Sequence, residues 1–148
     1  MKAMILKGIS SMEREPEPLA PAELPVPEPG PGEVLIRVRT CGVCHTELDE
    51  IEGRTPPPAF PVVPGHQAVG TVAALGPGAG SLQVGERVGV GWIHWACGQC
   101  DACRSGNENL CPSFRATGRD VDGGYGEYLR VPESFAHPIP KIFSDAEA

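Results

Sequence analysis

The alternation of apolar and polar residues along the chain predicts a protein built mainly from short β-strands. The clearest strand spans residues 33–40, where apolar side chains at every second position define one side of the strand. Val34, Ile36 and Val38 face one way, and Leu35, Arg37 and Arg39 face the other way. This two-residue period is typical of a half-buried strand.

Weaker apolar runs predict further strands on both sides of this segment. They lie at residues 1–6, 67–75, 126–131 and 136–139, and residues 82–90 are expected to form a turn and a strand. One short helix is expected at 46–53, because acidic residues fill its first turn and Gly53 provides a stop signal. Residues 16–31 contain seven prolines, which favours either a linker or an extended segment lying on a surface.

The composition supports a single β-rich domain. A chain of 148 residues is long enough to bury a real core. Its 19 glycines and 17 prolines favour many turns over long helices. We therefore expect a mainly β fold, a small barrel with short helices and with metal-binding loops inserted between its strands.

Charge and hydrophobicity argue against two classes of partner. The formal net charge is −7 and no basic patch with interleaved aromatic residues occurs, so we expect no nucleic-acid partner. No apolar run approaches the roughly 20 residues that span a membrane, and the first residues do not resemble a signal peptide. Six cysteines, four of them in one loop, suit a reducing compartment, and we expect the protein in the cytoplasm.

Four cysteines in one short loop are the strongest chemical signal in the chain. Cys97, Cys100, Cys103 and Cys111 follow the spacing C-x2-C-x2-C-x7-C. Four thiolates close a tetrahedron around Zn²⁺ and leave no open position, so such an ion would hold structure and do no chemistry. Thiolates also hold iron–sulfur clusters, which is a second interpretation. Disulfides are disfavoured, because three cysteines this close together could not pair well.

Two shorter segments contain further metal-binding residue types. Residues 41–47 include Cys41, Cys44 and His45, and residues 64–70 place His66 directly after a glycine. Each segment is a weak signal by itself, because a single cysteine or histidine is more often a buried structural residue than a ligand.

Together with the cysteine loop, these segments closely resemble the catalytic domain of zinc-dependent medium-chain alcohol dehydrogenases. The matching motifs occur in the family's order and spacing, and they cover nearly the whole chain. They are Gly42-Val-Cys44-His45-Thr46, Gly65-His66, Gly85-Glu-Arg-Val88, Cys111-Pro112 and Gly123-Gly-Tyr-Gly-Glu-Tyr128. The resemblance implies a GroES-like, partly open β-barrel over residues 1–148, and it favours a structural zinc lobe at about 95–113.

The resemblance also implies a catalytic zinc ion. Carried over by position, Cys44 and His66 would be two of its three protein ligands, and the fourth position would take water or substrate. Cys41 is an alternative ligand, but the family motif uses the second cysteine, so we interpret Cys41 as a buried structural thiol. A bound alcohol would lose its proton more easily and pass a hydride to NAD or NADP.

Four further residues take roles by the same resemblance. Thr46 would touch the substrate oxygen and begin the proton's route out, although threonine is also a natural helix cap. His45 would contact the cofactor pyrophosphate, and Glu47 would orient His66 through its free ring nitrogen. Trp92 would form an aromatic wall of the substrate pocket, with a core tryptophan as the alternative.

The sequence departs from the family pattern at two candidate site positions. Gln67 stands where many members have a glutamate able to approach zinc, so this position keeps an oxygen but loses the charge. Asp49 replaces a relay histidine that several members have. The proton would then leave through Asp49, through water or by another path.

By the same resemblance, the remaining parts of such an enzyme lie outside these residues. The third zinc ligand would follow Ala148, and no G-x-G-x-x-G motif of a dinucleotide-binding domain occurs. We therefore expect one domain of a two-domain alcohol dehydrogenase, inactive alone, homo-oligomeric when complete, and acting on a small alcohol or aldehyde. Polyol and threonine dehydrogenases of the same layout are alternatives, as is a non-catalytic zinc-stabilised binding module.

Overall fold

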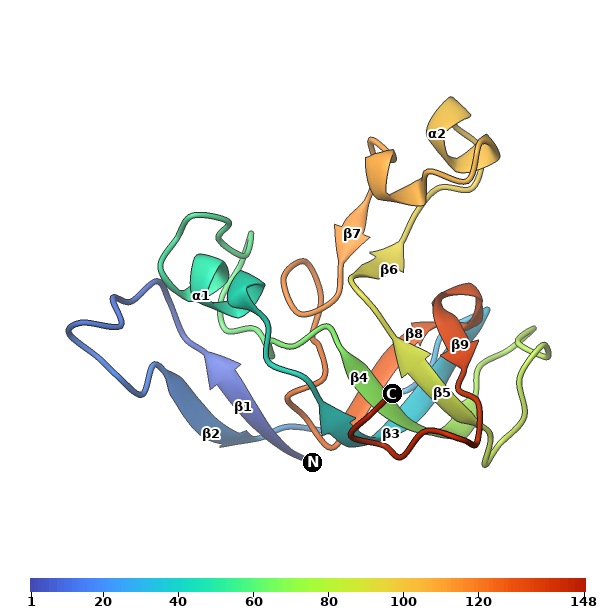
Figure 1. Ribbon diagram of the computed structural model, residues 1–148, viewed down its shortest axis with the longest axis horizontal. Coiled ribbons are helices and arrows are strands. Elements are labelled where there is room, and N and C mark those ends of the chain that lie inside the picture. Colours follow the sequence, from blue (N-terminus) through green and yellow to red (C-terminus); the bar gives the residue numbers. More distant parts are fainter.

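The computed structural model describes residues 1–148 and contains one main antiparallel sheet. Its five strands lie in the order β8-β3-β4-β5-β9, with β4 at the centre (Figure 1). Their bounds are β3 Glu33–Cys41, β4 Ala68–Leu75, β5 Arg87–Val90, β8 Tyr128–Pro132 and β9 Ala136–Pro138. Each strand that the apolar pattern predicts in this part of the chain is therefore present, with ends shifted by a few residues.

The core of this sheet is a cluster of ten buried aliphatic residues. All five strands contribute to it, together with one leucine from the turn before β5. Residues two apart on a strand point to the same face, which is why alternating sequences supply this cluster. Its members are Val34, Ile36, Ala68, Val72, Leu82, Val88, Val90, Leu129, Val131 and Ala136.

Strand β3 departs from strict alternation at one point. Leu35, expected on the exposed side with the arginines, is buried together with Val34 and Ile36. The pairing of β3 with β4 shifts its register between Leu35 and Ile36. Leu35 does not belong to the core cluster that holds Val34 and Ile36, so it lies on the opposite face of β3, and that face is also covered at this point.

The N-terminal residues form a separate two-stranded hairpin. Strand β1, Lys2–Leu6, pairs with β2, Leu19–Glu23, which lies inside the proline-rich segment. The extended interpretation of that segment is therefore correct. Proline fits at Pro21 because β2 pairs with β1 on one side only, so a missing N–H donor can face away from the partner.

A narrow stalk carries the cysteine loop away from the main sheet (Figure 1). The stalk consists of β6, Ile93–Trp95, and β7, Arg115–Ala116, which pair antiparallel. Between them lie helix α2, Asp101–Arg104, and a 3₁₀ turn at Glu108–Leu110. The sequence pattern did not reveal β6 or β7, because two or three residues are too few to establish a period.

One short helix packs beside the N-terminal hairpin. Helix α1 spans His45–Ile51, close to the predicted 46–53, and Gly53 follows it with a φ of 77°. A second 3₁₀ turn, Glu133–Phe135, joins β8 to β9.

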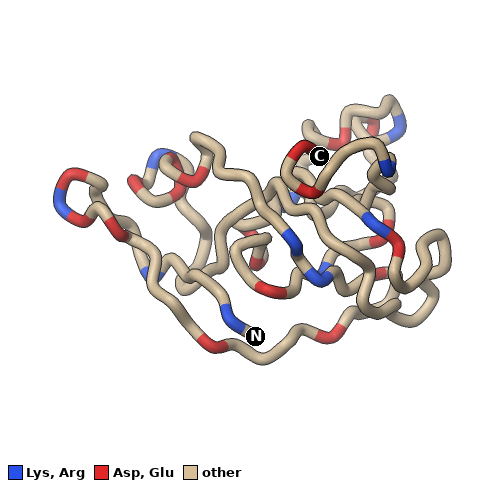
Figure 2. Tube along the Cα trace, turned by 60° about the horizontal axis from the view of Figure 1, so that its bottom comes forward, with Lys and Arg blue, Asp and Glu red and all other residues tan.

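No helix in this fold has the length and the apolar character needed to cross a membrane. Figure 2 shows acidic and basic residues interspersed along the chain, in keeping with the absence of a basic patch.

Candidate functional site

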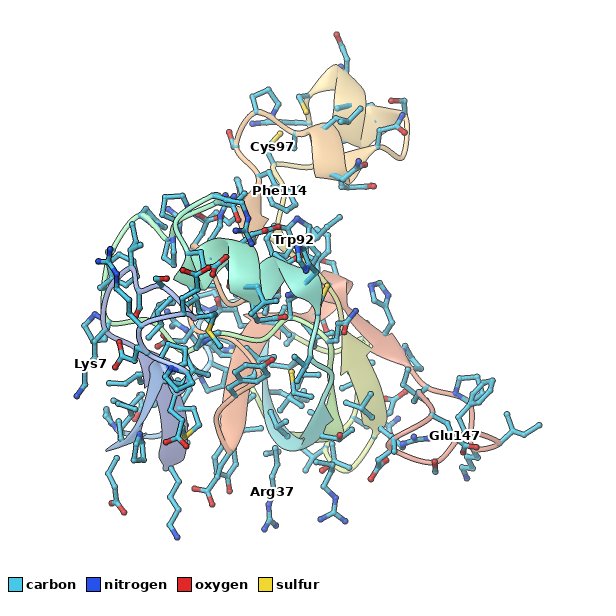
Figure 3. The ribbon with its side chains drawn as sticks, turned by 60° about the vertical axis from the view of Figure 1, so that its left-hand side comes forward. Lys7, Arg37, Trp92, Cys97, Phe114 and Glu147 are labelled. Atoms are coloured by element: carbon cyan, nitrogen blue, oxygen red, sulfur yellow. The ribbon has the colours of Figure 1, made fainter.

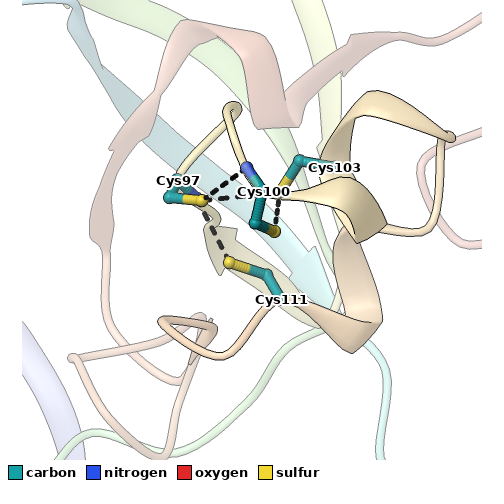
Figure 4. Close-up of side chains that lie close together, drawn as sticks. All are labelled: Cys97, Cys100, Cys103 and Cys111. Atoms are coloured by element: carbon teal, nitrogen blue, oxygen red, sulfur yellow. Dashed lines mark hydrogen bonds between the residues drawn. The ribbon is translucent and has the colours of Figure 1, made fainter.

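The four cysteines of the loop converge on one point at the end of the stalk (Figure 4). Their sulfur atoms all lie within 4.8 Å of one another. Sγ of Cys103 is 3.5 Å from that of Cys100 and 3.9 Å from that of Cys97. A tetrahedral ion with bonds of about 2.3 Å separates its ligand atoms by about 3.8 Å. The cluster therefore fits a tetrahedral metal ion, and the sulfur atoms are too far apart for disulfides.

Backbone N–H groups donate hydrogen bonds to the sulfur atoms of Cys97 and Cys111, an arrangement that suits thiolate ligands of a metal ion. The amide of Cys100 donates to Sγ of Cys97, and the amides of Cys97 and Ser113 donate to Sγ of Cys111, each at 3.4 Å. Amide donors lower the pKa of Cys97 to about 6, whereas burial raises the pKa of Cys103 to about 12. Some of these thiols must therefore lose a proton when metal binds, which makes binding pH-dependent.

The second group of candidate ligands is organised by one buried carboxylate. Oε1 of Glu47 lies 2.8 Å from Nδ1 of His66, and neither atom has another polar partner. Oε2 of the same residue accepts the backbone N–H of Cys44 at 2.7 Å. Glu47 and His66 are only 3% and 5% exposed. Cys44 and His66, 22 positions apart in the sequence, are thus tied to the same side chain.

The local sequence explains how Glu47 reaches both partners. Cys44 is the N-cap of α1, and Glu47 is the third residue of the helix, the position from which a carboxylate returns to the N-cap amide. His66 follows Gly65, which has a φ of 95°. A Cβ atom on Gly65 would lie 2.6 Å from the ring of Tyr125 and 3.0 Å from Sγ of Cys41. Only glycine allows the chain to pass here and present His66.

Thr46 and Cys41 lie on opposite sides of Cys44 in the sequence and differ in their surroundings. Oγ1 of Thr46 is 3.6 Å from Sγ of Cys44, so the hydroxyl and the thiol share one side of the helix start. Cys41 packs instead against the core cluster of the main sheet, and burial raises the pKa of its thiol. Cys41 is half-buried, and its role as a structural thiol stays a prediction.

His45, Asp49 and Gln67 point away from the buried carboxylate. The side chain of His45 is 76% exposed, and its Nε2 lies 3.6 Å from Oδ1 of Asp49, one helical turn further on. Asp49 also accepts a hydrogen bond from Nε of Arg54. The side chain of Gln67 is exposed and lies over Gly42, where its Oε1 would be 2.7 Å from an added Cβ atom.

Trp92 stands beside His66 and links it to residues that the sequence did not single out. The two rings meet edge to face, with centroids 4.9 Å apart and planes at 77°. On its other sides the indole meets Phe114, at 6.1 Å, and the guanidinium of Arg119, at 5.7 Å. Trp92 lies where the stalk meets the body of the protein, and Phe114 lies between it and Cys97 (Figure 3).

Glu50 is a second buried acid close to this group, and sequence reasoning missed it. Its side chain is 1% exposed and neither carboxylate oxygen has a hydrogen-bond partner. Burial, and after it the charge of Glu47, raises the pKa of Glu50 to about 8. The available signal was its position three residues after Glu47, which puts both acids on one face of α1.

Comparisons with known proteins agree with this architecture. The alcohol dehydrogenase GroES-like domain family matches residues 30–141. An alcohol dehydrogenase of Geobacillus stearothermophilus is 44% identical over 138 residues, which is 93% of this chain and 41% of that protein. The chain thus spans about two fifths of the length of this relative.

Solved structures give the same result. The crystal structure of an NAD-dependent alcohol dehydrogenase superposes with a TM-score of 0.90 at 35% identity, covering 98% of this chain and 41% of that one. A cobalt- and zinc-bound thermostable alcohol dehydrogenase from Pyrobaculum aerophilum has a TM-score of 0.79 at 32% identity, covering 93% and 41%.

The fold is therefore a mainly β, GroES-like half-barrel of the kind found in zinc-type dehydrogenases. This chain belongs to the alcohol dehydrogenase GroES-like domain family. The family and the fold class inferred from the sequence motifs are both confirmed.

We expect the four-cysteine cluster to bind one zinc ion tightly and the Cys44–His66 group to bind a second ion weakly, because two protein ligands hold metal less well than four. Zinc analysis after dialysis should give about one ion per chain, and Cys111→Ser should reduce it to near zero. Cys41→Ser is the control and should keep the ion. Two tightly held ions, or the visible absorption of an iron–sulfur cluster, would contradict this expectation.

The stability of the fold should decrease with pH because of Glu50. Its usual pKa is 4.5 and its folded pKa is about 8, so between these values the folded state holds a proton that the unfolded state has lost. In that window Glu50 lowers the free energy of unfolding by up to about 1.4 kcal/mol for each pH unit.

Glu50→Gln should remove this contribution and make the protein more stable than the wild type at pH 8. Urea denaturation at several pH values between 5 and 9 measures the effect, with Glu23→Gln, an exposed position on β2, as the control. Parallel curves for the wild type and Glu50→Gln would show that the buried acid is not protonated in this window.

Proposed function

We propose that this chain is the zinc-binding catalytic domain of an NAD- or NADP-dependent alcohol dehydrogenase that interconverts alcohols with aldehydes or ketones by hydride transfer. The observation that carries the proposal is the buried carboxylate of Glu47, which contacts Nδ1 of His66 and the amide of Cys44 at once. An acid that fixes the orientation of a histidine in this way is typical of metal centres.

The donor set suits zinc. Because Nδ1 of His66 faces Glu47, Nε2 is the nitrogen left for a metal ion. A thiolate from Cys44 and an imidazole from His66 are ligands that a borderline-soft ion accepts, and a three-ligand site keeps one position open. A zinc ion held there would supply Lewis acidity towards an alcohol or carbonyl oxygen, while the nicotinamide accepts or gives the hydride.

The protein's own groups then handle the proton. Thr46 places a hydroxyl 3.6 Å from Sγ of Cys44, where Oγ1 can accept the proton of a substrate hydroxyl and donate its own onward. Asp49, one helical turn from His45, is the candidate acceptor at the protein surface, where it also contacts Arg54. Gln67, whose side chain lies over Gly42, takes no part in this proton route.

His45 and Trp92 would define the two sides of the reacting centre. The exposed imidazole of His45 is free to meet the pyrophosphate of a cofactor. Trp92 shields His66 from one side and would form the apolar wall against which the substrate carbon chain packs.

The remaining parts of the enzyme are included in this proposal. The relatives are more than twice as long as this chain, and we infer that the third zinc ligand and the cofactor-binding domain of the natural protein correspond to their additional length. We propose that the complete enzyme forms a homo-oligomer and works in the cytoplasm, where six free thiols stay reduced. The structural zinc lobe at about 95–113 and the limits of the domain at 1–148 belong to the same proposal.

The test is alcohol-dependent reduction of NAD⁺ or NADP⁺ by the full product of the natural gene, with its intact mass determined first. We expect turnover with a simple alcohol, and Cys44→Ser should reduce it by about 10³-fold or more, because a ligand of the reacting metal is lost. Cys41→Ser changes the neighbouring thiol and should keep most of the activity.

The opposite ranking of the two cysteine variants would show that the wrong thiol has been assigned. A correctly folded product without turnover on any alcohol would instead favour a non-catalytic zinc-stabilised binding module. The chain of 148 residues alone should show no dehydrogenase activity.

A further inference from the structure

Trp92 is held in place from several directions. Its indole meets His66 edge to face on one side, Phe114 on another, and the guanidinium of Arg119 at 5.7 Å from the ring centroid. Its backbone oxygen accepts the amide of Thr117 at 3.0 Å. The loop after β7 therefore holds both the backbone and the side chain of Trp92.

Arg119 is itself fixed by the next residue in the chain. Its Nε and Nη2 atoms donate to the carboxylate of Asp120, at distances from 2.9 to 3.3 Å. Oδ2 of Asp120 also accepts the amide of Ala116 at 2.7 Å, and the amide of Asp120 donates to the oxygen of Ala116 at 3.0 Å. The guanidinium plane is thus anchored to the loop backbone and not left to rotate.

This ion pair also excludes one role for the arginine. Asp120 neutralises the guanidinium and occupies its Nε–Nη2 edge, the edge that binds carboxylates in a bidentate way. A substrate anion would have to displace it. The function that remains is a mechanical one, contact with the face of the indole.

A cavity adjoins Arg119, the residue that contacts the indole of Trp92. It has a volume of about 550 Å³ and is lined by residues that include Arg119, Asp120, His94, Pro58 and Leu129. Trp92 is not among its lining residues. Arg119 therefore separates the indole from a space large enough to accept it.

We propose that Arg119 is a positioning residue that holds Trp92 against His66 and thereby limits the bulk of the alcohol admitted beside the metal centre. The part of this inference that concerns the alcohol rests on the proposed function. The part that concerns the contact between Arg119 and Trp92 is independent of it. When Arg119 is shortened, the indole can turn into the cavity, and the space next to His66 becomes larger.

The first test measures the indole directly in this chain. The sequence has two tryptophans, and Trp95→Phe leaves Trp92 as the only one. In that background, Arg119→Ala should reduce the near-ultraviolet circular dichroism of Trp92 by about half or more and speed its local fluorescence depolarisation, because an aromatic ring that gains rotational freedom loses its fixed surroundings.

Matched variants separate this effect from general damage to the fold. Arg37→Ala removes an exposed arginine at the far end of the molecule from Trp92 and should change nothing (Figure 3). Asp120→Asn releases the anchor and should give a smaller change in the same direction. An unchanged Trp92 signal in a folded Arg119→Ala protein would overturn the proposal.

The second test uses the complete enzyme and compares a bulky, branched or aromatic alcohol with ethanol. Arg119→Ala should raise the ratio of the two kcat/KM values by about tenfold or more, mainly through a lower KM for the bulky alcohol. Arg119→Met, which keeps most of the volume, should restore part of the original ratio. An unchanged ratio would contradict the role of Arg119 in specificity. A wild-type enzyme that is inactive on all alcohols would instead refute the proposed function. In that case the first test alone decides whether Arg119 positions Trp92.

Discussion

One buried carboxylate, Glu47, connects the parts of this molecule that give it a candidate chemistry. Burying a charge is costly unless strong polar partners surround it. Here one oxygen meets the imidazole of His66 and the other meets the amide at the start of α1. The helix, the loop after Gly65 and the end of β3 must therefore keep a fixed relation. The same charge has a second consequence, because it helps to keep the neighbouring acid Glu50 in its neutral form.

The cysteine lobe contributes to this arrangement through the stalk. Trp92 immediately precedes β6 at the base of the stalk, whereas Phe114 precedes the antiparallel strand β7 at the end nearer the cysteines, and the two rings meet with centroids 6.1 Å apart. A metal ion that orders the lobe would also fix the spacing of β6 and β7. We infer that the lobe supports the aromatic wall next to His66, although its own sulfur atoms lie at the far end of the stalk.

Much of this organisation could be predicted from the sequence, and the failures have physical causes. Alternation located β3 because one of its faces packs in the core, but it did not predict that the opposite face is covered at Leu35. The spacing of the cysteines predicted their convergence, and family motifs pointed to Glu47 as the partner of His66. Glu50 and Arg119 were missed, because an acid in an acidic helix and an arginine in a loop are ordinarily exposed. Glu50 is buried and Arg119 is half-buried because of contacts with other segments of the fold, which a local sequence pattern does not reveal.

The central claim is that Glu47 organises Cys44 and His66 into a metal site. Titration of the metal-free protein with Co²⁺ measures this directly, since thiolate ligands give cobalt strong charge-transfer absorption. We expect a tight phase from the four-cysteine cluster and a weaker phase from Cys44 and His66. Glu47→Gln should weaken only the second phase, by about 10–100-fold. An unchanged second phase in Glu47→Gln, or its loss in Cys41→Ser but not in Cys44→Ser, would contradict the account.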